Sequence, residues 1–426
     1  MLAALSYHKP GETRRLLLTG LDVARELENR LRKFGKAVAA GSVRRRKETI
    51  ADIDILVTNG KPKPVMDYFT TMQDVRQVLA KGDTKSSVIL TSGIQADVRV
   101  LDEKSFGAAL QYFTGSKEHN VKLRQMAIKQ GYKLSEYGLF DKKDRIVASR
   151  TEEEIYRKLG LQHIEPEMRE DAGEIELALK GKLPKLIPYD AVRGDCHMHT
   201  TWSDGANSTE EMVQACIALG HEYIAITDHS KSTVIANGLD EKRVLKRIEE
   251  LDKLQRKYPE ITILKGSECD ILKSGELDYK PAILKKLDLV IASVHSNFKL
   301  NREEMTKRYL RAIDSGFVTA LGHPTGRLIN SRPPFDFDLE RVAVTAAKAG
   351  VAFEINSNPS RLDLKDAHIR IAKRAGARFL IDTDSHSIDN LRFMELGIAQ
   401  ARRGWLEAKD VLNTLPKAKF LKAIQR

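Results

Sequence analysis

Short apolar runs alternate with amphipathic stretches through the second half of the chain, and this alternation is its clearest pattern. Seven such runs occupy residues 194–197, 223–227, 261–265, 289–293, 317–321, 351–355 and 378–381. The stretches between most of them have the apolar spacing of a helix, as in residues 208–219, 302–314 and 339–349. Because strands that alternate with helices pair in parallel, the pattern predicts a parallel sheet, and seven strands favour its closure into a barrel.

The first half has a less regular mixture of helices and strands. Alternation of apolar and polar positions predicts strands at residues 52–58 and 95–101, with shorter strands at 37–42 and 87–91. Helical spacing predicts helices at residues 16–34, 66–79, 106–113 and 120–130, and Gly131 stops the last of them. These elements predict a mixed unit of helices and strands that is distinct from the regular second half.

An acidic, helix-forming stretch at residues 152–179 joins the two halves. It ends in Gly181-Lys-Leu-Pro184 and Ile187-Pro188, and closely spaced glycine and proline residues are typical of a linker. We therefore expect a first domain over residues 1–150, a linker over 151–190 and a second domain over 191–426.

Composition indicates a globular protein, because 42% of the residues are hydrophobic and 31% are charged. No run of 18 apolar residues occurs, and the segment from Met1 to Arg15 lacks a signal-peptide pattern. We therefore expect a cytoplasmic protein that does not bind membranes. The three cysteines form no CxxC pair, which argues against a disulfide framework or a zinc knuckle.

The net charge of +12 is concentrated in the first third of the chain. Residues 1–150 hold 28 Lys and Arg against 17 Asp and Glu, which gives a local net charge of +11. A basic region of this kind can hold a polyanion such as nucleic acid. A charge surplus that only aids solubility explains it equally well.

Each of the seven predicted strands ends in a side chain that can bind a metal ion. The first ends in His197-Met-His199, whose two histidines share one face because a strand repeats every two residues. The other strand ends and loops supply Asp204, His229, Glu268, His295, His323, Asn356, Asp384 and His386. A single histidine is more often a surface or core residue than a ligand, but six of the eleven histidines stand at such ends. Barrel enzymes place their chemistry where these ends converge.

Imidazole and carboxylate groups together suit zinc, manganese or iron better than calcium or magnesium. The histidines and acids are more numerous than one ion needs, so we expect two or three ions. Closely spaced ions stabilise both the attacking and the leaving oxygen of a phosphate ester. The pattern therefore predicts metal-assisted phosphoester hydrolysis.

These strand-end residues, with Thr227-Asp-His229 and Gly322-His-Pro324 among them, resemble the motifs of the PHP (polymerase and histidinol phosphatase) superfamily over residues 193–390. The resemblance implies a distorted seven-stranded α/β barrel with a three-metal cluster. It carries the ligand role to His197, His199, Asp204, His229, Glu268, His295, His323, Asp384 and His386. Asp228 and Asn356 fall outside that set, and a supporting role is the simpler interpretation for both.

A second group of carboxylates lies in the first half. Asp52 and Asp54 are two residues apart on a predicted strand and point the same way, and Asp97 lies on another strand. Three carboxylates can hold the two magnesium ions that in-line phosphoryl transfer requires. Ser42 and Arg45 could then hold a triphosphate. An isolated Asp-x-Asp pair is common in surface strands, and it gains weight here only from its neighbours.

The order Tyr112-Phe-Thr-Gly-Ser116, Asn120, Arg124 and Ser135-Glu-Tyr137 resembles the thumb of family X DNA polymerases. The resemblance implies that Asp52, Asp54 and Asp97 are the catalytic magnesium ligands. It also implies nucleotide or DNA contacts for Gly41, Ser42, Arg45, Tyr112, Phe113, Gly115, Asn120 and Arg124. On the residues alone, Tyr112 and Phe113 could equally be a core aromatic pair.

Joined to a PHP domain, this order resembles the bacterial and archaeal family X polymerases. The resemblance implies a nucleotidyltransferase-type α+β palm and thumb followed by a distorted (β/α)7 barrel. It implies an enzyme that fills gaps in DNA with dNTPs during repair, with a 3′-5′ exonuclease and an abasic-site endonuclease in the barrel. Separately, we expect the protein to be a monomer.

Members of that family normally have a further N-terminal region of helix-hairpin-helix modules, whereas this sequence begins close to the palm. It is either a short form or a fragment, and we expect weak DNA grip and low processivity. Two other functions remain open from the sequence. The barrel could be a small-molecule phosphatase of the histidinol-phosphate type beside an inactive first half, or the first half could be a DNA-binding module without catalysis.

Overall fold

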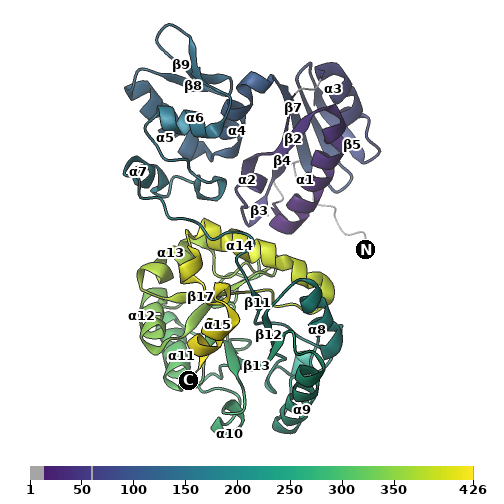
Figure 1. Ribbon diagram of the computed structural model, residues 1–426, viewed down its shortest axis with the longest axis vertical. Helices are drawn as coiled ribbons and strands as arrows, with labels where there is room; N and C mark the ends of the chain where they lie inside the picture. Colours follow the sequence, from purple (N-terminus) through teal and green to yellow (C-terminus); the bar gives the residue numbers. More distant parts are fainter. Residues whose placement is uncertain (1–13, 59–60, 426) are drawn as a thin grey trace, which may run out of the picture. The chain divides into compact units, whose positions relative to one another are not determined.

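The computed structural model describes residues 14–58 and 61–425, and the chain divides into two compact units between Leu183 and Pro184. In Figure 1 the first unit runs from purple to blue and the second from teal to yellow. Each unit has its own sheets, helices and core.

The first unit is built on a five-stranded mixed sheet with the strand order β2-β4-β7-β6-β5. Its strands are β2 (Lys36–Ala39), β4 (Asp52–Thr58), β5 (Val75–Lys81), β6 (Lys85–Leu90) and β7 (Gln95–Leu101). Strands β4 and β7 are parallel and place Asp54 opposite Asp97, while the other neighbours are antiparallel. Ile53 and Ile55 of β4 are buried, and the alternation leaves Asp52 and Asp54 on the other face.

Seven α-helices, three short 3-10 helices and five short strands complete the described part of this unit. The helices are α1 (Leu17–Leu31), α2 (Gly41–Arg44), α3 (Pro62–Thr70), α4 (Phe106–Thr114), α5 (Lys117–Lys129), α6 (Glu152–Lys158) and α7 (Glu174–Leu179). The strands are β1 (Arg15–Leu16), β3 (Thr49–Ile50), β8 (Lys133–Ser135), β9 (Gly138–Phe140) and β10 (Ile146–Ala148). Strand β1 pairs with β3, and β8 to β10 form an antiparallel sheet of their own.

A buried ion-pair network ties α2 of the first unit to its later helices. The guanidinium of Arg44 donates to Glu152 at 2.9 and 2.6 Å, and Glu152 also contacts the buried Arg169. Burial would raise the pKa of Glu152, but Arg169 and Arg44 lower it to about 2. Removing one partner of such a buried network would leave a charge uncompensated, so the network fixes these elements to one another.

Two segments differ from what the sequence predicts. The helix predicted at residues 66–79 is wrong in its second half, because α3 ends at Thr70 and β5 begins at Val75. Strand β5 pairs with β6 through two register shifts, so pairing with a neighbouring strand overrides the local helical spacing. Part of the segment expected as a linker folds instead within the first unit, as α6 and α7, because its acidic side chains bind arginines and backbone N–H groups there.

The second unit contains seven parallel strands in chain order. They are β11 (Gly194–Asp195), β12 (Tyr223–Ile226), β13 (Thr262–Asp270), β14 (Leu289–Ser293), β15 (Ala320–Leu321), β16 (Ala352–Asn356) and β17 (Arg378–Asp382). Just beyond β11 and β17, Met198 forms a parallel bridge with Ser385, and the N–H of His199 donates to Ser385 O at 2.8 Å. The sheet therefore closes on itself, which confirms the predicted distorted seven-stranded barrel.

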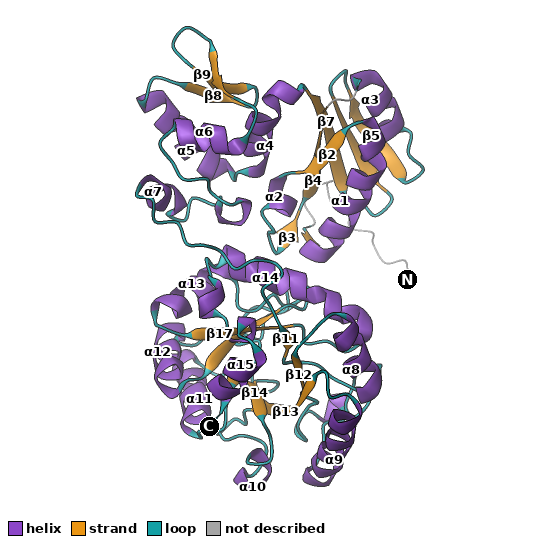
Figure 2. Ribbon diagram, viewed as in Figure 1, coloured by secondary structure: helices purple, strands orange, loops and turns teal. Residues whose placement is uncertain are grey.

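Helices surround these strands, as Figure 2 shows in purple and orange. They are α8 (Thr209–Ala218), α9 (Glu241–Lys257), α10 (Pro281–Leu284), α11 (Arg302–Asp314), α12 (Leu339–Ala349), α13 (Asp366–Arg374), α14 (Met394–Arg403) and α15 (Lys417–Ile424). Ser208 with Glu211 and Asn301 with Glu304 form capping boxes that start α8 and α11. Among the described residues, no helix has the length and apolar character needed to cross a membrane.

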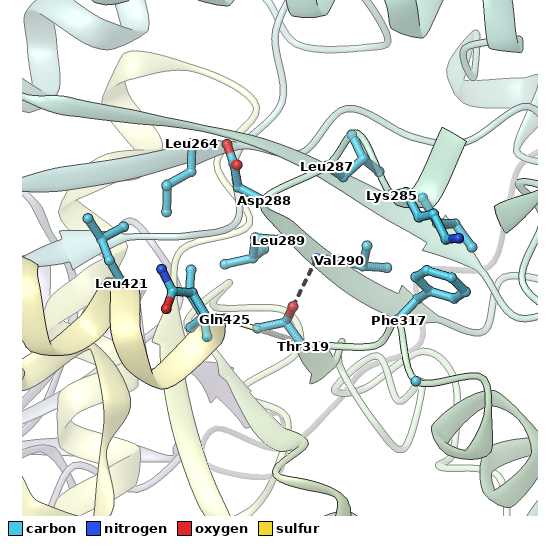
Figure 3. A pocket seen from close by; sticks show the side chains of 13 residues that line it. Leu264, Lys285, Leu287, Asp288, Leu289, Val290, Phe317, Thr319, Leu421 and Gln425 are labelled. Carbon is cyan, nitrogen blue, oxygen red and sulfur yellow. Dashed lines mark hydrogen bonds between the residues drawn. The ribbon is translucent and has the colours of Figure 1, made fainter. Parts of the chain in front are cut away.

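A cavity of about 490 Å³ lies at the N-terminal ends of the barrel strands (Figure 3). Leu264, Leu289 and Leu421 are among the apolar side chains that line it. Since the predicted metal ligands follow the C-terminal ends of the same strands, this cavity belongs to the opposite end of the barrel. The two ends of the barrel therefore differ in chemistry, and the polar end is the one that concerns function.

Candidate functional site

The nine residues predicted to bind metal converge at the C-terminal ends of the barrel strands. Eight of them fall into three groups whose possible ligand atoms all lie within 4.8 Å of one another. The groups are His199, Asp204, His229 and His386; His197, His199 and Asp384; and His229, Glu268 and His295. The ninth, His323, reaches them through its Nε2, which lies 2.8 Å from Glu268 Oε1. Because His199 and His229 each belong to two groups, the set forms one connected centre.

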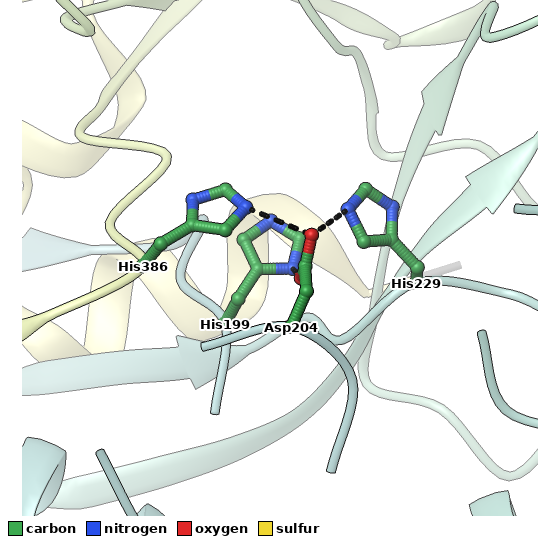
Figure 4. Close-up of side chains that lie close together, drawn as sticks. All are labelled: His199, Asp204, His229 and His386. Atoms are coloured by element: carbon green, nitrogen blue, oxygen red, sulfur yellow. Dashed lines mark ion pairs between the residues drawn. The ribbon is translucent and has the colours of Figure 1, made fainter. Parts of the chain in front are cut away.

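Asp204 lies between two histidines at the most exposed part of this centre (Figure 4). Its Oδ2 is 3.5 Å from His386 Nε2 and 3.6 Å from His229 Nε2. About a third of each of the Asp204 and His386 side chains is exposed, 32% and 34%, whereas His199 is buried. Solvent therefore reaches the centre at this group.

Glu268 is the central carboxylate of the buried part. Its Oε1 lies 3.2 Å from His295 Nε2, and its Oε2 lies 2.9 Å from His229 Nδ1 and 3.4 Å from His197 Nε2. Strand β13 supplies this residue, and the segments that follow β11, β12 and β14 supply the histidines around it. One carboxylate is thus positioned to contact cations held by several different strands.

Several buried polar atoms of the centre have no hydrogen-bond partner in the part of the chain that the structure describes. They are His197 Nε2, both ring nitrogens of His199, His229 Nδ1, Glu268 Oε2 and His323 Nδ1. Each such atom costs about 1–3 kcal/mol when it stays unsatisfied, so a cluster of them in a folded protein calls for a ligand. Imidazole nitrogens and carboxylate oxygens are donors that zinc, manganese and iron accept. The residues present therefore fit a cluster of divalent cations.

The pKa shifts of residues in the centre also favour cation binding. Burial would lower the pKa of His295, but Glu268 and Asp270 raise it to about 10. Burial would raise the pKa of Glu268, but His295, His229 and His197 hold it well below its usual range. In the absence of cations, Glu268 therefore stays charged and His295 keeps a proton. A divalent cation would take the place of such protons.

Two buried carboxylates contact the ring nitrogens of predicted metal-binding histidines. The sequence assigned no role to either carboxylate. Asp270 Oδ1 lies 2.5 Å from His295 Nδ1, and Glu354 Oε1 lies 2.5 Å from His197 Nδ1. A carboxylate on one ring nitrogen fixes the ring and leaves the other nitrogen to bind a metal. The strand period of two places Asp270 on the same face as Glu268 of β13, and this signal could have identified it.

Asp228 and Asn356 both form hydrogen bonds that hold predicted ligands or the loop that carries one. Asp228 accepts hydrogen bonds at 2.8 Å from the N–H of Thr200 and from the hydroxyl of Ser203, and so shapes the loop that carries Asp204. Asn356 Nδ2 donates to Asp384 Oδ2 at 3.0 Å. These contacts are the kind that a supporting role requires.

Arg361, which the sequence did not single out, brings a positive charge to the same centre. It lies in the loop after β16, and its Nε is 3.5 Å from Asp384 Oδ2. Its Nη1 is buried without a hydrogen-bond partner among the described residues. A guanidinium with an unused donor beside metal-binding residues can hold a phosphate oxygen. No strand-end motif includes Arg361, so only its position in the fold identifies it.

The three aspartates predicted to bind magnesium meet on adjacent strands of the first unit. Asp54 of β4 pairs in register with Asp97 of β7, and Asp52 is two residues before Asp54 on the same face. Lys85 Nζ lies 3.3 Å from Asp97 Oδ2, and Gln95 Nε2 donates to Asp97 Oδ1 at 3.0 Å. The parallel pairing of β4 with β7 therefore assembles the three carboxylates.

Repulsion from neighbouring carboxylates contributes to the raised pKa values of Asp54 and Asp52. Burial and the nearby charges of Asp52 and Asp97 raise the pKa of Asp54 to about 7, against the opposing effect of Arg99. Burial and Asp97 also raise the pKa of Asp52. The raised pKa values of Asp52 and Asp54 reflect a concentration of negative charge that a divalent cation would neutralise.

The magnesium requirement of this site should depend on pH. Below pH 7 the free site holds a proton on Asp54, and a cation must displace that proton before it binds. We expect the Mg²⁺ concentration for half-maximal primer extension to rise by up to about tenfold per pH unit below pH 7 and to level off above it. Primer extension titrated with MgCl₂ between pH 6 and 8 measures this. A requirement that stays constant over the range would contradict the raised pKa of Asp54.

Gly41 and Ser42 begin α2 directly beside Asp54. Gly41 has a φ of 60°, and a Cβ there would lie 2.9 Å from Asp54 Oδ2, so the approach depends on glycine. Arg45 follows α2, and its Nε lies 3.0 Å from Glu170 Oε1. The residues predicted to hold a triphosphate thus adjoin the aspartates, and Glu170 is the anion that Arg45 binds in this structure.

The predicted aromatic and minor-groove residues lie at the α4–α5 junction. The rings of Tyr112 and Phe113 meet edge to face with centroids 5.1 Å apart, and the guanidinium of Arg124 lies 5.9 Å from the Tyr112 centroid. Asn120 Nδ2 donates to Tyr112 O at 2.7 Å and to Gly115 O at 3.1 Å. The Asn120 amide therefore holds the turn between the two helices. Contacts of these residues with a nucleotide or template stay a prediction.

Comparison with known proteins finds matches in both units. The model of the DNA polymerase beta thumb matches residues 109–170, and the model of the PHP domain matches residues 195–358. The DNA polymerase/3′-5′ exonuclease PolX of Bacillus subtilis (strain 168) is 41% identical over 399 residues, which are 92% of this chain and 70% of that protein.

Other relatives cover less of the chain. A probable phosphatase of Thermoanaerobacter sp. (strain X514) is 34% identical over 52% of this chain and 89% of its own length. Crystal structures of Leishmania infantum polymerase beta, in ternary primer–template and gap complexes, are 20% identical with a TM-score of 0.34. They cover 38% of this chain and 78% and 72% of their own chains.

The two family models fall on the two units that the fold separates, and the Bacillus relative spans nearly the whole of this chain. The probable phosphatase matches only about half of it. The match to the Bacillus protein has 41% identity over 92% of the chain, and the thumb and PHP models match this chain in succession. The family is therefore assigned from this match and not from the phosphatases. The chain belongs to the PolX family of DNA polymerase/3′-5′ exonucleases.

Proposed function

We propose that the first unit fills short gaps in DNA with dNTPs and that the barrel removes 3′-terminal nucleotides. The observation that carries the proposal is the presence of two separate ligand sets in one chain. Three aspartates meet in the first unit, and nine histidines and carboxylates meet in the barrel. The net charge of +11 over residues 1–150 supports DNA as the common substrate.

In the barrel, the chain's own residues prepare a phosphodiester for hydrolysis. Two or three manganese, zinc or iron ions held by the nine ligand residues would activate water and neutralise the phosphate charge. Arg361 would bind a phosphate oxygen through the unused donor at Nη1 and orient the ester. Glu354 and Asp270 keep the rings of His197 and His295 in place, so little rearrangement accompanies the reaction.

In the first unit, the aspartates and basic residues position a nucleotide for transfer. Magnesium ions held by Asp52, Asp54 and Asp97 would neutralise the charge that develops on the transferred phosphate. Arg45 would bind the triphosphate with its guanidinium in place of Glu170. The absence of a side chain at Gly41 leaves room for phosphates next to Asp54.

One assay on the wild-type chain tests both halves of the proposal. A gapped duplex with a labelled primer is incubated with dNTPs and either Mg²⁺ or Mn²⁺, and the primer is followed by gel electrophoresis. We expect extension when dNTPs are present and 3′ shortening with Mn²⁺ when they are absent. A chain that neither extends nor shortens the primer with either ion would refute the proposal. Light scattering and cell fractionation would check the expected monomer and cytoplasmic location.

The barrel has a second candidate function, because probable phosphatases match about half of the chain. Such an enzyme would hydrolyse a small phosphate monoester such as histidinol phosphate. Release of inorganic phosphate from that compound, together with no shortening of DNA, would favour this function. The three-aspartate site in the first unit favours DNA instead, since a small-molecule phosphatase has no use for it.

Replacing Asp270 tests whether the centre binds metal as proposed. In Asp270→Asn the side chain keeps its shape but loses the charge that holds His295 Nδ1–H. We expect a loss of metal affinity of about 10- to 100-fold, which is the usual effect of removing such a partner. The measurement is the metal retained after dialysis against graded chelator, determined by atomic emission.

Asp252→Asn is the matched control, because Asp252 pairs with Lys265 on the outer surface of the same unit. Its metal content should equal that of the wild type. Equal metal retention in Asp270→Asn and Asp252→Asn would contradict the role assigned to Asp270.

A further inference from the structure

Two large apolar side chains project into solvent next to the metal-binding centre. Val234 and Ile235, in the turn η4 (Val234–Ala236) between His229 and α9, are 81% and 99% exposed. They are the most exposed large hydrophobic residues among those the structure describes. Adjacent apolar side chains held in water at the edge of a site indicate a surface that binds something. We call residues 233–237 the apolar turn.

The apolar turn is rigidly built. The N–H groups of Ala236 and Gly238 both donate to Thr233 O at 3.1 Å, and that of Asn237 donates to Val234 O at 3.0 Å. Asn237 adopts a left-handed conformation with a φ of 54°. These bonds close a tight loop whose backbone is satisfied internally. The outward direction of Val234 and Ile235 is therefore a fixed feature of the fold.

The apolar turn connects two sides of the centre. On one side, Thr233 Oγ1 donates to Asp270 Oδ2 at 3.1 Å and lies 3.5 Å from His295 Nδ1. On the other side, Asn237 Nδ2 donates at 3.3 Å to the backbone oxygen of Ser203, the residue before Asp204. Since two extended residues span at most about 7 Å, the Cα atom of Ile235 lies within that distance of the Cα atom of Thr233.

The charge beside the apolar turn favours a polyanionic partner. Arg243 Nη1 donates to Asn237 O at 2.9 Å and to Gly238 O at 3.3 Å, and Nη2 contacts Trp202 O. These acceptors are uncharged, and within the described residues the guanidinium of Arg243 forms no ion pair with a carboxylate. An apolar pair next to an uncompensated guanidinium suits a molecule that combines flat apolar groups with anionic ones. A nucleic acid strand is such a molecule, with bases and phosphates one nucleoside apart.

We propose that Val234 and Ile235 contact the base at the 3′ end of a DNA strand and separate it from its neighbour while the last phosphodiester occupies the metal-binding centre. The proposal rests on the proposed 3′ exonuclease function and names how that site holds its substrate. Apolar side chains that insert beside bases unstack them in other DNA-binding proteins. Such a contact with the base face is indifferent to sequence, as removal of successive nucleotides requires.

The double variant Val234→Ser with Ile235→Ser tests this contact, and Leu219→Ser is its matched control. Leu219 is 59% exposed at the end of α8, which precedes the start of β12, so it lies at the opposite end of the barrel. The probe is single-stranded DNA with 2-aminopurine as the 3′-terminal base and a non-hydrolysable last linkage. Its fluorescence increases when the terminal base leaves the stack.

We expect the wild type and Leu219→Ser to increase the fluorescence and the double variant to leave it unchanged. The KM for 3′ shortening of ordinary DNA should rise about 10- to 100-fold in the double variant, the scale of losing a base-stacking contact. Primer extension and bound metal should stay at wild-type levels, because neither site includes these side chains. Ile235→Phe, which keeps an apolar surface, should retain the low KM that the double variant loses.

The outcomes separate the two levels of the argument. Failure of the wild type to shorten DNA would overturn the exonuclease function itself. Normal shortening by the double variant with an unchanged KM would overturn only the base contact. Loss of metal from the double variant would show that the turn merely supports the centre. A changed oligomeric mass with unchanged KM would show that the turn binds another protein chain. Loss of metal and a changed oligomeric mass would each overturn the proposal.

Discussion

Asp54→Ala is expected to abolish primer extension on gapped DNA, with a loss on the order of 10³-fold or more, while 3′ shortening continues. Asp54 is the aspartate at the middle of the three, paired in register with Asp97 and flanked by Asp52. Its removal takes away the carboxylate that both neighbours need in order to share cations. Single-nucleotide incorporation measured under single-turnover conditions gives the size of the loss.

Asp83→Ala is a suitable control, because Asp83 is an exposed carboxylate in the turn between β5 and β6 of the same sheet. It should extend primers at the wild-type rate. Retention of more than a tenth of the incorporation rate in Asp54→Ala would contradict the assignment of the nucleotidyl-transfer site.

His197→Ala is expected to have the opposite effect, with loss of 3′ shortening on the order of 10³-fold and normal primer extension. The ring of His197 is fully buried, with Nδ1 held by Glu354 and Nε2 facing Glu268 and Asp384. Its loss takes the ring partner away from Glu354 Oε1 and removes one donor from the centre. The amount of bound metal, measured by atomic emission, should fall together with the activity.

His221→Ala provides the comparison within the barrel, because His221 precedes β12 at the opposite end from the centre. It should keep both the bound metal and the exonuclease activity. If His197→Ala shortened DNA as fast as His221→Ala, the barrel centre would not be the site of the exonuclease. The two variants of largest effect therefore assign each reaction to its own unit.

Much of the fold follows from local sequence patterns. The predicted strands at residues 52–58, 95–101 and 289–293 agree with β4, β7 and β14, and the helices at 302–314 and 339–349 agree with α11 and α12. The helices and the strands β4 and β7 are strongly patterned, and β14 is a short continuous apolar run that is buried along its whole length, so local pattern is enough to predict them. Strand β5 escaped prediction because an exposed edge strand has no such pattern, and its pairing with β6 decides its conformation.

Some residues of the candidate sites could be predicted from the sequence and others could not. Ligands at strand ends could be predicted because parallel strands bring their ends to one edge, and the nine residues named from the sequence do converge. The two-residue spacing from Glu268 could have identified Asp270, whereas the contacts of Glu354 and Arg361 appear only when their distances to His197 and Asp384 are known. Their roles and those of the named residues stay predictions until the variants are measured.

By itself, the sequence determined the order of the elements, the chemistry of the ligands and the relationship to a polymerase family, because spacing and residue type are properties of the chain. The tertiary structure decided which donors lie close enough to share a cation, which carboxylates contact which rings, and that Arg45 faces Glu170. It also decided that Val234 and Ile235 project into solvent beside the centre rather than into the core. The physical reason is that contacts between distant segments depend on barrel closure and strand register, and no local pattern encodes these distances.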